Sequence, residues 1–347
     1  MYLKKIVWLI LLIGLLCCGA FAYMVYQAIF SSNTTFSENE VVLYIPTGTT
    51  FDEMRPILDP YIEDLSTFEK IAQKKGYTAN IKGGKYVLRK GMSNNDMINT
   101  LRNNNIPVKV SFNNQETVSD LAGRIASQIE ADSVSLLTAF NELSYLDTIG
   151  FNAHHKLSLY IPNSYEFFWN TSATQFRERM RKEYDRFWNE ERLQKASKLG
   201  LTPLEISTLA SIVHKETAKV DERPRVAGVY LNRLRKGMLL QADPTVIYAL
   251  KLHSGDFNTV YKRVLYKDLT LDSPYNTYKY AGLPPGPIAM PDITAIDAVL
   301  NPEAHDYLYF VANVTDFGYH KFAKTLTQHN KNKEEYVRWI NSQQIKR

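Results

Sequence analysis

The longest apolar run of the chain lies at its N-terminus. Residues 6–30 contain no charged side chain, and a run of that length can cross the hydrocarbon core of a bilayer as a helix. Lys4 and Lys5 precede the run, so the positive-inside tendency places the short N-terminal end in the cytoplasm. We therefore expect residues 1–30 to form a cytoplasmic tip and one transmembrane helix in the cytoplasmic (inner) membrane, with the remaining chain on its periplasmic or extracytoplasmic side.

A secretory signal is the alternative interpretation of this run. The sequence Ala20-Phe21-Ala22 resembles a small-residue cleavage site, but a signal peptide has a shorter apolar core than this one. The length favours an uncleaved span. Residues 31–40 are polar, and we expect them to form a linker.

A strand, a turn and a capped helix recur three times after this linker. The β-type runs are residues 41–45, 86–88 and 108–112, and each leads to a hydroxyl residue followed three positions later by an acid, the signature of a helix capping box. The three pairs are Thr50 with Glu53, Ser93 with Asp96, and Thr117 with Asp120. Ser66 and Glu69 predict one more capped helix between the first two copies. The pattern predicts an α+β module in residues 41–110.

Residues 111–200 connect this module to the C-terminal part of the chain. We expect a helix over residues 133–143, an irregular stretch over residues 152–169 with His154 and His155 on the surface, and one long charged helix over residues 175–196. Adjacent histidines point in different directions and have no third ligand nearby, so they do not indicate a metal site.

The helix that follows carries a lone acid on its apolar side. Thr202, with an acid three residues later and a proline directly after it, predicts where the helix begins. One helical face then carries Leu209, Ile212, Val213 and Glu216, which follow one another at the spacing i, i+3, i+4 and i+7. Burial raises the pKa of a carboxyl group, as a general acid working near neutral pH requires. The alternative is a structural ion pair between Glu216 and Arg225 or Arg233.

Polar loops follow this helix. A second helix is expected over residues 224–237, and residues 240–248 then offer Gln, Asp, Thr and Tyr side chains, which are groups that a sugar site uses. Residues 273–278 and the proline-rich residues 282–288 are predicted loops, the latter a stiff wall. We expect a helix over residues 292–300 and two strands over residues 307–312 and 319–322.

Composition narrows the functional classes. Both cysteines, Cys17 and Cys18, lie in the predicted span, so the exported part has no disulfide framework. The formal charge of +5 is mild for 347 residues and includes no basic run with interleaved aromatics, which argues against a nucleic-acid partner. The histidines lack acidic or cysteine companions at metal-ligand spacing, so we expect neither a metal nor a cofactor. The 22 tyrosines suit a surface that meets carbohydrate.

Ordered motifs give the chain a specific resemblance. The segments LASIVHKET, VAGVYLNRL, GMLLQADPTVIYAL, SPYNTY, GLPPGPI, YLYFVAN and GYHKF occur in this order and resemble the YceG-like family of endolytic murein transglycosylases, also called the MltG family. The resemblance covers nearly the whole chain and implies an α+β fold with a transmembrane helix, a LysM-like module over residues 41–110, a connecting region over residues 111–200 and a mixed α/β catalytic domain over residues 201–347. LysM modules bind N-acetylglucosamine-containing glycans.

The resemblance also implies an activity. The family cleaves peptidoglycan strands between N-acetylmuramic acid and N-acetylglucosamine without water, which leaves 1,6-anhydro ends and limits strand length during wall synthesis. The family's catalytic Glu falls on Glu216. By analogy, it would protonate the glycosidic oxygen and then accept the proton of the muramoyl 6-hydroxyl. Glycan strands, the inner membrane and wall-synthesis enzymes are the implied partners. The residues we expect to orient the glycan are Gln241, Asp243, Thr245, Tyr248, Tyr275, Asn276, Tyr278 and His320.

Two alternatives remain at this point. A muramidase would hydrolyse the same bond with two carboxyl groups about 5 to 9.5 Å apart, and its second acid would be Asp243 or, less plausibly, Asp221 or Glu222. A non-catalytic scaffold would bind glycan and recruit wall-synthesis enzymes, but it would not need a desolvated carboxyl group at Glu216. The chain also departs from the family pattern at Leu157-Ser158 and Ala289, which leaves its substrate subsites open.

Overall fold

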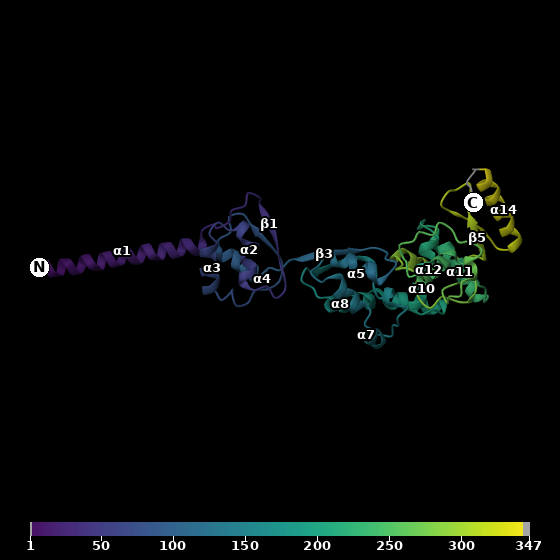
Figure 1. Cartoon of the computed structure of the whole chain (residues 1–347), viewed down its shortest axis with the longest axis horizontal. Coiled ribbons are helices and arrows are strands. Elements are labelled where there is room, and N and C mark those ends of the chain that lie inside the picture. The colour runs from purple at the N-terminus through teal and green to yellow at the C-terminus, as the bar shows by residue number, and fades with distance from the viewer. Residues whose placement is uncertain (1, 343–347) are drawn as a thin grey trace. The chain divides into compact units, whose positions relative to one another are not determined.

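The computed structural model describes residues 2–342, which form a mixed α+β protein (Figure 1). Helices dominate, and the strands form short two-stranded sheets. The predicted α+β class is therefore confirmed at this level. The chain divides into two compact units. The first contains the residues up to 110 with the short segments 128–131 and 165–172, and the second contains the rest.

The N-terminal helix α1 (Tyr2–Phe30) has no buried side chain and is long and apolar enough to cross a membrane. Its C-terminal end packs against helices α3 and α4 of the first unit. The Asn94 side chain donates a hydrogen bond to the Ala28 carbonyl (2.8 Å), and the buried Asn33 side chain contacts Asn94 in turn (2.7 Å). Part of the predicted linker over residues 31–40 therefore packs on the first unit.

One pair of antiparallel strands and three helices form the core of the first unit. Strand β1 (Glu40–Ile45) pairs with β2 (Gly84–Arg89). Helices α2 (Phe51–Leu58), α3 (Leu65–Lys74) and α4 (Asn94–Asn103) supply the rest of its apolar core. The side chains at the centre of this core are Ile45, Met54, Leu58, Phe68, Leu88, Met97 and Leu101.

The helix caps of this region match the prediction with one exception. Complete capping boxes occur at Thr50, Ser93 and Thr117. The expected cap at Ser66 is wrong, because Asp64 accepts the N–H of Thr67 (2.9 Å) and starts α3 two residues earlier. Asp caps a helix as well as Ser does, so the earlier residue takes the position.

The connecting region is mostly helical. Strand β3 (Pro107–Phe112) pairs with β4 (Asn163–Phe168), and the boundary between the two units falls within both strands. The helices are α5 (Val118–Ala126), α6 (Ser133–Phe140), α7 (Leu143–Thr148), α8 (Ala173–Phe187) and α9 (Glu190–Leu199).

The single helix expected over residues 175–196 is wrong, because the structure has α8 and α9 in its place. The Asn189 side chain accepts the N–H of Arg192 (3.0 Å) and caps α9, while Trp188 is buried at the break. The N-cap at Asn189 therefore starts a new helix where the prediction had one helix continue.

Helix α10 (Pro203–Glu216) is the central helix of the second unit. It packs against α9, α11 (Arg223–Arg235), α12 (Asp243–Ser254) and α13 (Ile293–Leu300). Residues 206–213 are all buried, so the helix is enclosed on every side and does not present a single apolar face.

The polar members of α10 tolerate this burial because they bond within their own helix. The hydroxyls of Ser207 and Thr208 donate to carbonyls one turn earlier, at 3.0 and 2.8 Å. The proline-rich loop 282–288 packs directly against α10, where the Ile288 N–H donates to the Ser211 hydroxyl (3.0 Å). This loop therefore packs on α10 at Ser211, more than one turn before its C-terminal residue.

The C-terminal part forms a hairpin and a helix. Strands β5 (Tyr309–Ala312) and β6 (His320–Ala323) are antiparallel, as predicted. Helix α14 (Leu326–Ser342), which the sequence analysis did not predict, packs on both strands. Figure 1 shows α14 beside β5 at the C-terminal end of the second unit.

Candidate active site

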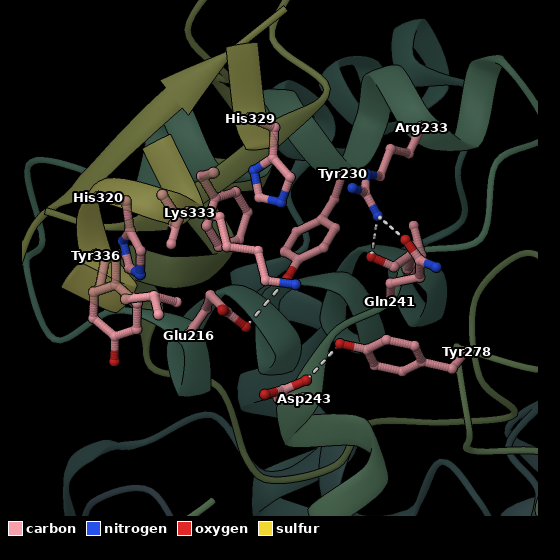
Figure 2. Close-up of a pocket in the computed structure, with 15 residues that line it drawn as sticks. Glu216, Tyr230, Arg233, Gln241, Asp243, Tyr278, His320, His329, Lys333 and Tyr336 are labelled. Atoms are coloured by element: carbon pink, nitrogen blue, oxygen red, sulfur yellow. Dashed lines mark hydrogen bonds between the residues drawn. The ribbon is translucent and has the colours of Figure 1, made fainter. Parts of the chain in front are cut away.

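A polar cavity of about 380 Å³ opens in the second unit at the C-terminal end of α10 (Figure 2). Its walls come from α10, α11, the start of α12, the loop around Tyr278, the β5–β6 hairpin and α14. Several segments that are far apart in the sequence therefore converge on Glu216, the last residue of α10.

The Glu216 carboxyl group is set to titrate near neutral pH. Burial raises its pKa from an ordinary value of 4.5 to about 7. Asp243 and Glu222 act in the same direction, whereas His320 and the Tyr230 hydroxyl, which donates to Glu216 Oε2 (3.1 Å), oppose the rise. The C-terminal end of a helix also disfavours a negative charge. The predicted desolvation of this acid is confirmed.

The arginines that could have neutralised Glu216 have other partners. Arg225 pairs with Glu303 (2.9 Å). The buried Arg233 donates to the carbonyls of Leu308 (2.6 Å) and Leu240 (2.8 Å). Within residues 2–342, neither arginine forms an ion pair with Glu216. The structural ion pair considered above is therefore wrong, and the carboxyl group faces the cavity.

The turn between α10 and α11 holds the hairpin in place. The nearly inaccessible Glu222 accepts two hydrogen bonds from His320, one from its backbone N–H (2.6 Å) and one from ring Nδ1 (2.8 Å). Burial raises the pKa of Glu222, but these hydrogen bonds outweigh it and the pKa is lowered overall. The anionic Glu222 makes Nδ1 the protonated nitrogen and leaves Nε2 for a ligand. Phe310 packs edge-on against the ring (4.9 Å).

The opposite wall is built by residues at the start of α12. The Tyr278 hydroxyl donates to Asp243 Oδ1 (2.5 Å). Gln241 adopts a φ of 51°, a left-handed conformation that is uncommon for a residue other than glycine. Its N–H donates to the Thr277 carbonyl (3.1 Å), and its side-chain oxygen accepts from Arg233 (3.3 Å). Gln241 is exposed and lines the cavity in this uncommon conformation.

The structure brings together half of the predicted glycan-orienting residues. Gln241, Asp243, Tyr278 and His320 line the cavity with Glu216. The other four, Thr245, Tyr248, Tyr275 and Asn276, are not among the residues that line it.

These four residues bond or pack within the protein. Thr245 is fully buried against Thr277 (2.8 Å), and the buried Asn276 amide donates to the carbonyls of Leu269 and Leu271. The rings of Tyr248 and Tyr275 contact each other (4.7 Å). The polar groups of Thr245 and Asn276 therefore bond to the loop around residues 269–277.

Sequence reasoning missed several residues of the cavity. Tyr230 was not singled out, and Arg233 was considered only as an ion-pair partner, yet both line the site from α11. His329, Lys333 and Tyr336 line it from α14. Their spacing of i, i+4 and i+7 is the pattern of one helical face, so a search for polar helical faces near the C-terminus would have found them. Within residues 2–342, no group of three or more metal-ligating side chains is arranged to hold an ion.

Comparisons with known proteins agree with this architecture. The profile of the YceG-like family matches residues 43–335. The chain is 31% identical over 339 residues to an endolytic murein transglycosylase of Bacillus subtilis (strain 168), covering 92% of this chain and 90% of that protein. It is also 29% identical over 358 residues to an endolytic murein transglycosylase of Streptococcus pneumoniae serotype 2 (strain D39 / NCTC 7466). That match covers 94% of this chain and 64% of the Streptococcus pneumoniae protein.

A solved structure is also similar. The crystal structure of a yceG-like protein from Listeria monocytogenes superposes with a TM-score of 0.57 at 30% identity, covering 85% of this chain and 99% of that one. The family profile spans most of the chain, and the Bacillus subtilis relative is matched over nearly its full length. The chain therefore belongs to the YceG-like family.

Proposed function

We propose that this protein is an endolytic peptidoglycan transglycosylase and that Glu216 is its acid and base. One observation carries the assignment of Glu216. It is a desolvated carboxyl group with a pKa of about 7 that opens into a polar cavity and forms no ion pair with any residue that the structure describes. Such a group is protonated often enough near neutral pH to act as an acid, and basic enough afterwards to act as a base.

The reaction needs no second carboxyl group. Protonated Glu216 donates its proton to the glycosidic oxygen while the bond from that oxygen to C1 of N-acetylmuramic acid breaks. The 6-hydroxyl oxygen of the same sugar then bonds to C1, and the Glu216 carboxylate accepts the hydroxyl proton. The enzyme returns to its starting protonation state, and the new end is a 1,6-anhydro sugar. An intramolecular hydroxyl group replaces the water and the nucleophile of ordinary glycoside hydrolysis.

The cavity walls suit a neutral sugar chain. The Asp243 carboxylate, the Gln241 amide, the Tyr278 hydroxyl and Nε2 of His320 offer donors and acceptors around Glu216. We assign to them the orientation of the glycan. Thr245, which bonds to Thr277, and Asn276, which accepts the N–H of Tyr278, hold the loop that carries Tyr278 in position.

The anchor and the first unit fit action at the cell wall. Helix α1 meets the length and composition of a single membrane span, and with Lys4 and Lys5 on the cytoplasmic side the second unit faces the wall. The first unit acts as a LysM-like glycan-holding module, and wall-synthesis enzymes in the same membrane are partners. Co-purification from detergent-solubilised membranes tests that association.

The second candidate is a hydrolase, because Asp243 also lines the cavity. Asp221 and Glu222 are less suited to that role, since Asp221 accepts the Tyr319 hydroxyl (3.0 Å) and Glu222 accepts His320. We expect Asp243→Asn to lower kcat by less than about tenfold, because the amide still accepts the hydrogen bond from Tyr278. Its products should keep 1,6-anhydro ends. Replacement of Glu216 by glutamine should cost at least about 100-fold in kcat, and a loss of that size in Asp243→Asn would favour a two-carboxylate hydrolase.

The pH dependence should report Glu216. The acid form is required, so kcat/KM should fall as the pH rises through about 7. The Tyr230 hydroxyl lowers the pKa of Glu216 by donating to its carboxylate. Tyr230→Phe removes only that oxygen, so the alkaline limb should move to higher pH. A pH–rate profile of both proteins on the same glycan measures the shift, and a limb that stays in place or moves to lower pH would contradict the assignment.

A further inference from the structure

One wall of the cavity carries a cation that a neutral glycan would not need. His329, Lys333 and Tyr336 project from one face of α14 into the cavity that holds Glu216 (Figure 2). Helix α14 is held over the hairpin by an ion pair between Lys321 and Glu335 (2.7 Å) and by stacking of Tyr309 on His329 (5.2 Å). The position of Lys333 is therefore set by contacts on both strands.

Within residues 2–342, Lys333 forms no ion pair. The acids of its own helix are engaged elsewhere, Glu335 with Lys321 and Glu334 with Arg338. The Asp243 carboxylate across the cavity accepts the Tyr278 hydroxyl. Glu216 is the remaining acid of the cavity, and it forms no ion pair with Lys333; its pKa of about 7 leaves it protonated for part of the time at neutral pH. The ammonium group of Lys333 is thus a charged donor at the cavity wall that no described carboxylate pairs with.

The neighbours of Lys333 add polar groups and further positive charge. The buried Nδ1 of His329 has no hydrogen-bond partner among the described residues. Burial, together with Lys333 and Arg233, lowers the pKa of His329, so this ring is neutral at pH 7 and can donate or accept a hydrogen bond. Arg233, which donates to two backbone carbonyls, also lines this cavity and adds a second cationic side chain. The side of the cavity formed by α14 is therefore suited to an anion.

We propose that this α14 face binds a carboxylate of the muramoyl side chain and that Lys333 is its specificity-determining residue. This inference rests on the proposed function, because the glycosidic bond must lie at Glu216 for the side chain to reach α14. The sugars of the glycan are uncharged, whereas each muramoyl lactyl group carries either its own carboxylate or a peptide stem with carboxylates. An ammonium–carboxylate hydrogen bond is stronger than a neutral one. Lys333 would favour strands that keep this charge.

The test uses the full-length protein in detergent and two pairs of substrates. The first pair is glycan with intact stems, its amines acetylated, and the same glycan with its carboxylates converted to amides. The second pair is glycan stripped of stems, which exposes the lactyl carboxylates, and the same stripped glycan with these carboxylates converted to amides. The KM for each substrate is measured for the wild type, Lys333→Met and Lys333→Arg. Lys331→Met is the matched control, because Lys331 is exposed on the same helix and does not line the cavity.

The wild type and Lys331→Met should bind charged strands more tightly than amidated ones, with a KM ratio of about two to five, as for an ion pair to an exposed lysine. Lys333→Met should lose this ratio, and Lys333→Arg should retain most of it. If the ratio survives in the stripped glycan but not in intact stems, the lactyl carboxylate is the ligand, and the reverse result identifies the stem.

An equal ratio in the wild type and Lys333→Met would overturn the proposal, as would an equal loss in Lys331→Met. The proposed function is tested separately by looking for 1,6-anhydro ends after the wild type has digested amidated strands, because their formation does not require a charge on the muramoyl side chain.

Discussion

Replacing Glu216 by glutamine is expected to lower kcat by at least about 100-fold, because general acid–base catalysis contributes typically ~10²- to 10⁴-fold and an amide cannot supply it. Glutamine keeps the shape of the side chain and can still accept the hydrogen bond from Tyr230. The measurement is the rate at which the full-length protein in detergent releases fragments from purified glycan strands. Retention of wild-type turnover would exclude Glu216 as the acid.

The same substitution should not weaken the fold. The folded-state pKa of Glu216 is about 7 against an ordinary value of 4.5. Between these values the unfolded chain has lost a proton that the folded protein retains, so stability decreases as the pH rises through this window. Glutamine removes that penalty, and the Tm of Glu216→Gln at pH 8 should equal or exceed that of the wild type. An inactive variant with a lowered Tm would point to a structural role.

The second large effect concerns the ion pair between Arg223 and Asp292 beside the end of α10, which we call the clamp. The buried Arg223 donates to both oxygens of Asp292 (2.7 and 2.8 Å) and to the Thr217 carbonyl at the end of α10 (3.4 Å). Removal of one partner from a fully buried ion pair costs about 3 to 5 kcal/mol, and because the Asp292 side chain is 30% exposed we expect a smaller cost of about 2 to 3 kcal/mol here. Arg223→Met should therefore lower the Tm of the second unit by roughly 4 to 12 °C, measured by thermal unfolding of the full-length protein.

Arg225→Met is the matched control for this clamp. Arg225 lies two residues further along α11 and pairs with Glu303 at the surface, where both side chains are substantially exposed. A pair of that kind contributes about 0 to 1 kcal/mol. A similar loss in both variants would show that the effect comes from α11 in general and not from the clamp.

Asp292 also gives the clamp a pH dependence. Burial raises the pKa of its carboxyl group, but His214, Arg223 and the Ala295 N–H outweigh burial and hold the pKa well below its usual range. A depressed pKa contributes stability above the unfolded value that is lost as the pH falls through the folded one. The wild-type protein should therefore lose more Tm on acidification than Arg223→Met does.

Local signals accounted for what the sequence predicted well. The capping box at Thr202 and the helical spacing up to Glu216 are properties of one short segment, and the structure confirms both the start of α10 and the desolvation of its last residue. The three repeated capping boxes and the β5–β6 hairpin were predicted on the same basis. Helix α10 proved to be buried on all sides because its hydroxyls bond to its own carbonyls, which periodicity alone does not reveal.

Tertiary packing decided the rest of the site. Tyr230 reaches Glu216 only because of how α11 is rotated against α10, and no spacing in the sequence encodes that rotation. Asn276 has the polarity of a sugar-binding residue, yet it is buried and bonds to its own loop. The type of a polar residue indicates what it can bond, whereas burial decides whether a substrate or the protein receives the bond.

The most direct test of the central claim is the chemistry of the new glycan ends. Purified strands are digested with the full-length protein in water enriched in oxygen-18, and the fragments are analysed by mass spectrometry. If Glu216 acts as the sole acid and base, the ends will be 1,6-anhydro sugars, lighter than reducing ends by one water and free of the label, and Glu216→Gln will produce none. New reducing ends in place of anhydro ends would contradict the account, and label in them above that of undigested strands kept in the same water would show that water, activated by a second group, is the nucleophile.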